Sequence, residues 1–142
     1  MRTKLLVMIA ALGLLLASLP VWAHHAFAAE FDANKQIKLR GTVAKMEWIN
    51  PHAWLHLDVK GSDGKVITWM IELGPPNALL KRGWTKKDVP AGIELLVEGY
   101  QAKDGAMRAN GRDVTFPDGK KLFAGSSGTG APLDGADATE RR

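Results

Sequence analysis

The fold is decided by residues 53–73, which read AWLHLDVKGSDGKVITWMIEL. Apolar residues occupy every second position on both sides of a central turn, as in two strands that each direct one face toward a core. The two apolar sets are Ala53, Leu55, Leu57 and Val59, and then Ile67, Trp69, Ile71 and Leu73. The turn, Gly61-Ser62-Asp63-Gly64, carries residues that favour tight reversals. This stretch therefore predicts a β-hairpin.

The segment before the hairpin predicts a long, bent strand. From Ile37 the apolar positions alternate as far as Val43, but the next apolar residues are Met46 and Trp48. One extra residue shifts the phase of the alternation, which indicates a β-bulge within the strand. Asn50-Pro51 then marks the turn into the hairpin.

The segment after the hairpin adds one short helix and further strands. Residues 76–82 begin with proline and are followed by glycine, which are signals for the start and end of a helix. Apolar alternation over residues 93–99 predicts a fourth strand, Val114 and Phe116 mark a fifth, and Pro117-Asp118-Gly119 turns into a terminal hairpin. The order favours a mainly all-β fold, a small five- to six-stranded OB-like Greek-key barrel with one short helix. A plain meander and a β-sandwich are alternatives with the same elements.

The first 23 residues are typical of a secretory signal peptide. Arg2 and Lys4 precede an apolar run over residues 5–19, which a proline follows before the small residue Ala23. We expect cleavage after Ala23, with Ala28 as a second site and an uncleaved anchor as the alternative. The expected organisation is a signal peptide at 1–23, an N-terminal arm at 24–36, the barrel domain at 37–124 and a disordered tail at 125–142.

Composition limits the classes of partner and site. Cleavage after Ala23 leaves 119 of the 142 residues, enough for one small domain, and 17 of the 19 basic residues against 15 acidic ones. So small an excess predicts no nucleic-acid partner, and a basic cluster is expected to be a solvated face: Lys81, Arg82, Lys86 and Lys87. The chain has no cysteine, which excludes disulfides and thiolate ligands. No second apolar run reaches membrane-spanning length, so we expect a periplasmic or secreted domain without a membrane span.

Several groups of residues along the mature chain form a recognisable pattern. They are His24-His25 with Phe27 and Glu30-Phe31-Asp32; Gly41-Thr42-Val43; Trp48 with Asn50-Pro51-His52-Ala53-Trp54; Glu72 with Gly74 and Pro76-Asn77; Gly83-Trp84; Ala102-Lys103-Asp104-Gly105; and Pro117-Asp118-Gly119 with Leu122-Phe123. In these groups, which cover nearly the whole mature domain, the chain resembles the exported bacterial domain-of-unknown-function family 6152. The resemblance implies export and a single small domain, and it implies no activity.

Four histidines in the first third of the mature chain suggest a metal site. At the expected cleavage site His24 becomes the N-terminus, and its amine, its imidazole and a second histidine would supply nitrogen ligands that suit copper. His52 and His56 are about 13 Å apart on a straight strand, too far to hold one ion together. Met70 is expected opposite Trp54 or His56, where its thioether suits Cu(I). The predicted metal residues are therefore His24, His25, His52, His56 and Met70; the alternative is an exposed arm without metal. The chain is in this respect similar to small periplasmic OB-fold copper-binding proteins, whose sequence motif it lacks.

The function that we expect is a non-enzymatic binding module, with a copper-type ion as its ligand. In a second hypothesis, a metal-free interaction module uses Trp54 and Trp48 to hold an envelope protein or polymer, because Trp54 alternates with the core residues. Alternatively, Trp54, Trp48 and Met70 are packing residues beneath the arm, where Phe27 and Phe31 supply the other half of the contact. A third hypothesis is an enzyme with His52 as general base in a cleft, although the sequence places no nucleophile beside it.

Overall fold

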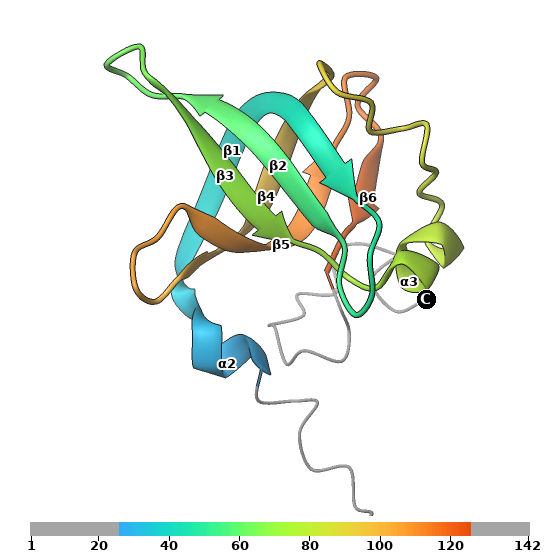
Figure 1. The fold of residues 1–142 in the computed structure, drawn as a ribbon, viewed down its shortest axis with the longest axis horizontal. Helices are drawn as coiled ribbons and strands as arrows, with labels where there is room; N and C mark the ends of the chain where they lie inside the picture. Colours follow the sequence, from blue (N-terminus) through green and yellow to red (C-terminus); the bar gives the residue numbers. More distant parts are fainter. Residues whose placement is uncertain (1–25, 126–142) are drawn as a thin grey trace, which may run out of the picture.

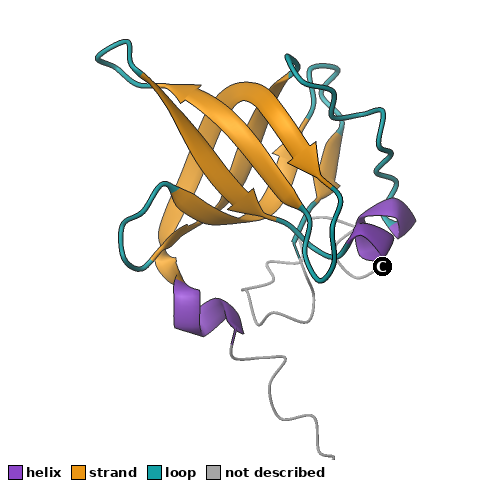
Figure 2. Ribbon diagram, in the orientation of Figure 1, coloured by secondary structure: helices purple, strands orange, loops and turns teal. Residues whose placement is uncertain are grey.

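The computed structural model describes residues 26–125, in which strands predominate and two short helices accompany them (Figures 1 and 2). The elements are, in chain order, α2 (Ala26–Glu30), β1 (Phe31–Glu47), β2 (Trp54–Lys60), β3 (Val66–Glu72), α3 (Pro76–Lys81), β4 (Glu94–Ala102), β5 (Arg108–Thr115) and β6 (Lys121–Phe123). The predicted signal peptide, His24, His25 and the predicted tail from residue 126 onward lie outside the described residues.

The strands form one sheet that closes on itself. Its order is β3-β2-β1-β4-β5-β6, and the neighbours in this order are antiparallel. In addition, the end of β3 pairs in parallel with the start of β5, from Met70 opposite Arg108 to Glu72 opposite Asn110. This pairing joins β1, β2, β3, β5 and β4 into a ring, which confirms the predicted OB-like barrel.

Strand β1 belongs to both halves of the barrel. Its first part pairs with β4 and its second part with β2 (Figure 1). The register toward β2 shifts between Val43 and Lys45, which confirms the bulge that the phase of the apolar residues predicted. Such a bulge bends a strand and increases its twist, so that one 17-residue strand serves two sides of a closed sheet.

The barrel interior is filled by the alternating apolar residues of the strands. The fully buried ones include Val43, Ala53, Leu55, Leu57, Ile71, Leu95, Val97, Ala109 and Val114. Ile67 was expected among them, and this prediction is wrong because the side chain is 43% exposed. It lies near the tip of the β2–β3 hairpin, which extends beyond the body of the barrel (Figure 1).

The segment around α3 packs against the barrel core. Leu79 and Trp84 are buried within the core, and Nε1 of Trp84 donates to the carbonyl oxygen of Phe123 at 3.1 Å. Arg82 does not lie on a solvated face, as was expected, but is only 4% exposed. Its guanidinium donates to the carbonyl oxygen of Gly125 at 2.6 Å and lies 4.7 Å from the centre of the Phe123 ring. Gly125, assigned to the tail by composition, is thus held by the barrel.

Two strands begin earlier than the apolar alternation indicated. β1 starts at Phe31 rather than at Ile37, after the short helix α2, and its first residues are paired discontinuously with β4. β5 starts at Arg108 and includes the buried polar residue Asn110, so a hydropathy pattern shows only its end at Val114.

Candidate functional site

The outer face of β2, β3 and β5 carries a row of polar and aromatic side chains. Residues paired directly across neighbouring strands point to the same side of a sheet. Trp54 on β2 pairs with Glu72 on β3, and Glu72 pairs with Asn110 on β5. Because the adjacent residues Leu55 and Ile71 are buried in the interior, this row lies on the outside of the barrel.

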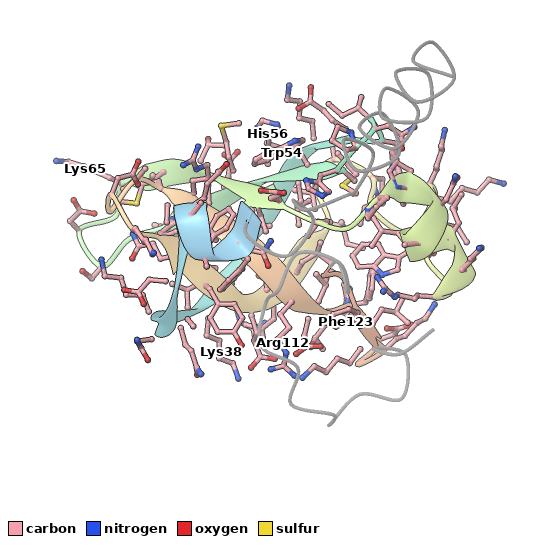
Figure 3. All side chains as sticks on the ribbon, turned by 90° about the horizontal axis from the view of Figure 1, so that it is seen from below. Lys38, Trp54, His56, Lys65, Arg112 and Phe123 are labelled. Atoms are coloured by element: carbon pink, nitrogen blue, oxygen red, sulfur yellow. The ribbon has the colours of Figure 1, made fainter. Side chains whose placement is uncertain are left out.

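A second row lies beside the first on the same outer face. His56 on β2 pairs with Met70 on β3, which pairs with Arg108 on β5. The register thus places Met70 opposite His56, one of the two partners that were expected. Figure 3 shows Trp54 and His56 together on one side of the barrel, with Lys38 on the opposite side.

Helix α2 and the start of β1 cover one end of this outer face. Phe27 and Phe31 are almost fully buried and form a small cluster with Tyr100 of β4. The ring of Phe27 meets that of Tyr100 edge-on at a centroid distance of 5.3 Å, a favoured aromatic geometry. The backbone amide of Lys103 donates to the carbonyl oxygen of Glu30 at 2.9 Å, which fixes the end of α2 to the β4–β5 loop.

A cleft of about 330 Å³ lies between α2 and the outer face. We call it the α2 cleft, and its lining residues are Phe27, Glu30, Phe31, His52, Trp54, Glu72, Arg108 and Asn110. Aromatic and polar side chains from four separate parts of the chain thus face one space. Its volume falls at the lower end of the roughly 300–1,000 Å³ that small-molecule sites occupy.

A histidine and a glutamate are joined within the cleft. Nδ1 of His52 contacts Oε1 of Glu72, whose residue is 8% exposed. Burial raises the pKa of the Glu72 carboxyl above its usual range, and His52 and Arg108 oppose this effect while Glu30 adds to it. Because Nδ1 of His52 is engaged, Nε2 is the ring nitrogen that can meet a ligand.

Two buried polar atoms of the cleft residues have no hydrogen-bond partner in the described part of the chain. They are Oδ1 of Asn110, a residue only 2% exposed, and Nε of Arg108. The outer nitrogen Nη2 of Arg108 lies 3.7 Å from Glu30 and 4.0 Å from Asp104. Buried polar groups are nearly always hydrogen-bonded in folded proteins, so these two atoms mark where a bonding group from outside the chain is expected.

A second histidine–glutamate pair lies beside Trp54. Nε2 of His56 is 2.7 Å from Oε2 of Glu47, whose other oxygen accepts from Lys45 at 3.0 Å. These hydrogen bonds from His56 and Lys45 lower the pKa of the Glu47 carboxyl. Glu47 and Glu72 are the two residues that pair with Trp54 across the sheet, so both glutamates flank the indole.

The predicted metal-binding and interaction residues lie at separate positions in the structure. His52 lies in the α2 cleft, while His56 contacts Glu47 beside Met70, which is 42% exposed. Trp54 lines the cleft, but Trp48 packs against the main core rather than beneath Phe27 and Phe31 of the arm, which form a separate cluster. His24 and His25 lie outside the described residues. Within residues 26–125 no group of three or more histidine, aspartate and glutamate side chains is placed to hold a metal ion.

The α2 cleft contains a candidate general base, and its lining holds no hydroxyl or thiol nucleophile. A histidine that is oriented by a carboxylate is the arrangement of a general base, and His52 has that arrangement with Glu72. None of the lining residues carries a hydroxyl or thiol group. The cleft is therefore chemically suited to binding and to proton transfer.

Sequence reasoning missed four site residues: Glu30, Glu72, Arg108 and Asn110. Glu72 carried a usable signal, because it is a charged residue on the strand face that also holds Met70. The segment around Arg108 and Asn110 shows no apolar alternation, so nothing in the sequence placed these residues on a strand that closes the barrel.

The comparisons with known proteins identify a family for the chain, but they assign it no function. In the described segment, residues 26–125, no helix is long and apolar enough to cross a membrane. No curated protein and no solved structure matches the chain significantly. The sequence model of one protein family matches residues 11–111, and this range includes every residue that lines the α2 cleft. The chain therefore belongs to the family of unknown function DUF6152.

Proposed function

We propose that the protein is an exported binding module that takes a small ligand in the α2 cleft. The observation that carries this proposal is Oδ1 of Asn110, a buried acceptor that belongs to a residue lining the cleft and has no partner in the described chain. A buried polar atom without a hydrogen bond costs about 1–3 kcal/mol, which a ligand that donates to it would recover. An aromatic lining with a few placed polar groups is also typical of small-molecule sites.

Export is supported by the N-terminal sequence, and the position of α2 favours cleavage after Ala23 over cleavage after Ala28. Cleavage after Ala28 would cut within the helix and remove Phe27, which is 3% exposed and packs on Tyr100. Cleavage after Ala23 keeps the helix intact. Expression of the full chain in a Gram-negative host, followed by fractionation and intact mass, tests this part. The expected product is periplasmic and begins at His24; an unprocessed cytoplasmic chain contradicts export.

Ligand binding is tested by NMR on the exported protein with a library of small polar compounds. Bound compounds are expected to shift the indole N–H of Trp54 and the side-chain amide of Asn110 together. Trp54→Ala should weaken binding about tenfold or more, since it removes one aromatic wall. Val66→Ala is the control, because Val66 lies on the hairpin and is 61% exposed. Shifts that cluster away from the cleft, or an unchanged affinity in Trp54→Ala, contradict the proposal.

A copper-type ion is a second candidate ligand, because the chain enters α2 directly after His24 and His25. Phe27, three residues after His24, lines the cleft that holds His52. With cleavage after Ala23, the amine and imidazole of His24 and Nε2 of His52 would supply three nitrogens that suit copper. A carboxylate behind a metal-bound histidine orients the ring, and Glu72 occupies that place. The pair of His56 and Met70 is the alternative set, with one imidazole and one thioether.

Titration of the exported protein with Cu(I) and Cu(II) tests the metal hypothesis. Binding tighter than micromolar is expected, with loss in His52→Ala and in a chain whose N-terminal amine is acetylated. His56→Ala is the matched control and should retain the affinity. A loss confined to His56→Ala would place the ion with Met70 instead, and affinity weaker than micromolar in the parent protein contradicts a copper function.

A further inference from the structure

We infer that the ligand of the α2 cleft is a neutral, polyhydroxylated ring of the sugar type. The inference rests on the proposed function, since it names the ligand class for the same cleft. It follows from the hydrogen-bonding needs of the cleft, from its charges and from its aromatic walls.

The hydrogen-bonding needs of the cleft are of two opposite kinds. Oδ1 of Asn110 accepts and therefore needs a donor, whereas Nε of Arg108 donates and therefore needs an acceptor. Both atoms belong to residues that line the same cleft. A hydroxyl group both donates and accepts, so a ring with neighbouring hydroxyls meets both needs. An ammonium group only donates and a carboxylate only accepts, so neither alone meets them.

The charges of the cleft are already paired with one another. Arg108 lies beside Glu30 and Asp104, and Glu72 contacts His52. An anionic ligand would have to displace Glu30 from Arg108, and a cationic ligand would have to compete with His52 for Glu72. A neutral ligand leaves both contacts in place, which favours recognition by hydrogen bonds over recognition by charge.

The aromatic walls suit the apolar faces of such a ring. Phe27 and Phe31 are buried on the side of α2, and Trp54 stands on the sheet as the partly buried aromatic residue of the cleft. Sugar rings present C–H groups on their faces and hydroxyls at their edges, so one face can pack on an indole while the edge meets the polar residues.

The outer face would let a longer polymer continue beyond the cleft. From Trp54 the face extends to His56 (Figure 3) and to the exposed Met70, which pairs with His56 across the sheet. The face of strands two and three is the surface on which OB barrels bind oligosaccharides and oligonucleotides. The small excess of basic residues in the mature chain favours the uncharged of these two polymers.

Calorimetry and NMR with defined probes test the inference on the exported, metal-free protein. The probes are N-acetylglucosamine, its tetramer, spermidine and a galacturonate oligomer, which separate neutral, cationic and anionic ligands. The neutral sugars are expected to bind and to shift the Trp54 indole and the Asn110 side-chain amide. A tetramer that binds more tightly than the monomer identifies an envelope glycan as the source, whereas equal affinities identify a free sugar.

Asn110→Ala removes the acceptor and should weaken sugar binding about tenfold or more. Asn77→Ala is the matched control, because Asn77 is exposed on α3 and away from the cleft. Since Asn110 is buried, Trp54→Ala serves as the second variant if Asn110→Ala does not fold, and it should lose sugar binding to a similar degree. Spermidine or galacturonate bound in the cleft in place of the sugars overturns the inference and leaves the cleft as a binding site. Failure of all four probes to shift cleft residues overturns the inference, and failure of the compound library as well overturns the proposed function.

Discussion

The imidazole of His52 and the carboxylate of Glu72 are in contact, so the turn before β2 is fixed to the last residue of β3. Glu47 makes an equivalent contact with His56 beside Trp54. The two glutamates differ in burial, because Glu72 is enclosed by α2 while Glu47 is open to solvent on the outer face. Burial has the largest effect on the pKa of Glu72 and raises it, whereas hydrogen bonds have the largest effect on the pKa of Glu47 and lower it.

Replacement of the buried carboxyl, Glu72→Gln, is expected to raise stability at neutral pH. A carboxyl whose pKa is raised in the folded state favours folding while it is protonated, and this contribution is lost as the pH rises through the folded pKa. Glutamine carries no charge at any pH, so the variant should unfold at a higher temperature than the parent at pH 7. The advantage should disappear below the ordinary glutamate pKa of 4.5. Thermal unfolding between pH 3.5 and pH 8 measures it.

The matched variant Glu47→Gln is expected to show the opposite sign. Hydrogen bonds from His56 and Lys45 lower the pKa of Glu47, so its ionised form favours folding above the ordinary pKa of 4.5. The variant should therefore unfold at a lower temperature than the parent at pH 7, and the two should converge as the acid is protonated. The same sign for both glutamate variants at pH 7 would contradict the opposite roles of the two pairs.

Glu98 bridges two lysines on the side of the barrel away from the α2 cleft. Its oxygens lie 3.1 Å from Lys38 and 3.2 Å from Lys121. Partial burial raises the pKa of Glu98, but the two ammonium groups lower it more, so its stabilising contribution holds above pH 4.5 and is lost as the pH falls through the lowered pKa. Glu98→Gln should reduce the free energy of unfolding at pH 7 by about 0.5–1 kcal/mol, since exposed pairs contribute little each.

Urea denaturation at pH 7 and pH 3 measures the contribution of Glu98. Its effect should be smaller at the lower pH, where more of the carboxyl is protonated, and should shrink in 1 M NaCl, where ion pairs are screened. Glu94→Gln is the control, because Glu94 and its partner Arg40 are both mostly exposed and should contribute less. An effect of Glu98→Gln that is unchanged at pH 3 would show that the ion pairs are not its origin.

Arg82 is expected to be the most consequential basic residue around α3. Arg82→Ala removes the hydrogen bond to Gly125 and the contact with the Phe123 ring. Hydrogen bonds from a charged donor contribute about 1.5–3 kcal/mol and a buried cation–π contact adds to that, so we expect a loss of roughly 2–4 kcal/mol. Lys81→Ala, one residue earlier and exposed, should change stability by less than about 0.5 kcal/mol. Equal losses from both substitutions, measured by urea denaturation, would contradict the anchoring role of Arg82.

The barrel was predictable because its strands alternate on one face. The hairpin over residues 53–73, the bulge after Val43 and the position of Met70 opposite Trp54 or His56 all follow from a period of two and a short turn, and the structure selects His56. Prediction failed where burial comes from contacts distant in the sequence. Arg82 is buried by residues some forty positions later, and a local charge pattern cannot contain that information.

The candidate site was less predictable than the barrel for the same reason. His52 and Trp54 were identified from the hairpin alone, but the residues that complete the cleft come from α2 and from β5. Asn110 is polar and nevertheless buried, because β5 closes the barrel against β3 and α2 covers the junction. Only the topology reveals that a polar stretch without apolar alternation forms one wall of a binding site.

Gly99 permits the close approach of β4 and β5 that positions Asn110. The register between these strands shifts between Glu98 and Gly99, and a Cβ atom at Gly99 would collide with the carbonyl oxygen of Asn110. Because the obstacle is backbone, no side-chain rotation relieves it. Gly99→Ala should therefore destabilise the fold by about 1–3 kcal/mol and move Asn110 relative to the α2 cleft, which would also weaken N-acetylglucosamine binding.

Gly64→Ala separates this effect from the general cost of replacing a glycine. Gly64 lies in the hairpin turn with a φ of +81°, and an added Cβ would meet nothing within 4 Å, so only backbone strain of about 1–2 kcal/mol is expected. The hairpin variant should lose stability and keep its affinity for the sugar, whereas Gly99→Ala should lose both. Urea denaturation measures the stability of the two variants, and calorimetry measures their affinity for the sugar. A Gly99→Ala protein that binds the sugar as tightly as the parent would mean that the approach of β4 to β5 supports the barrel but does not set the position of Asn110 in the cleft.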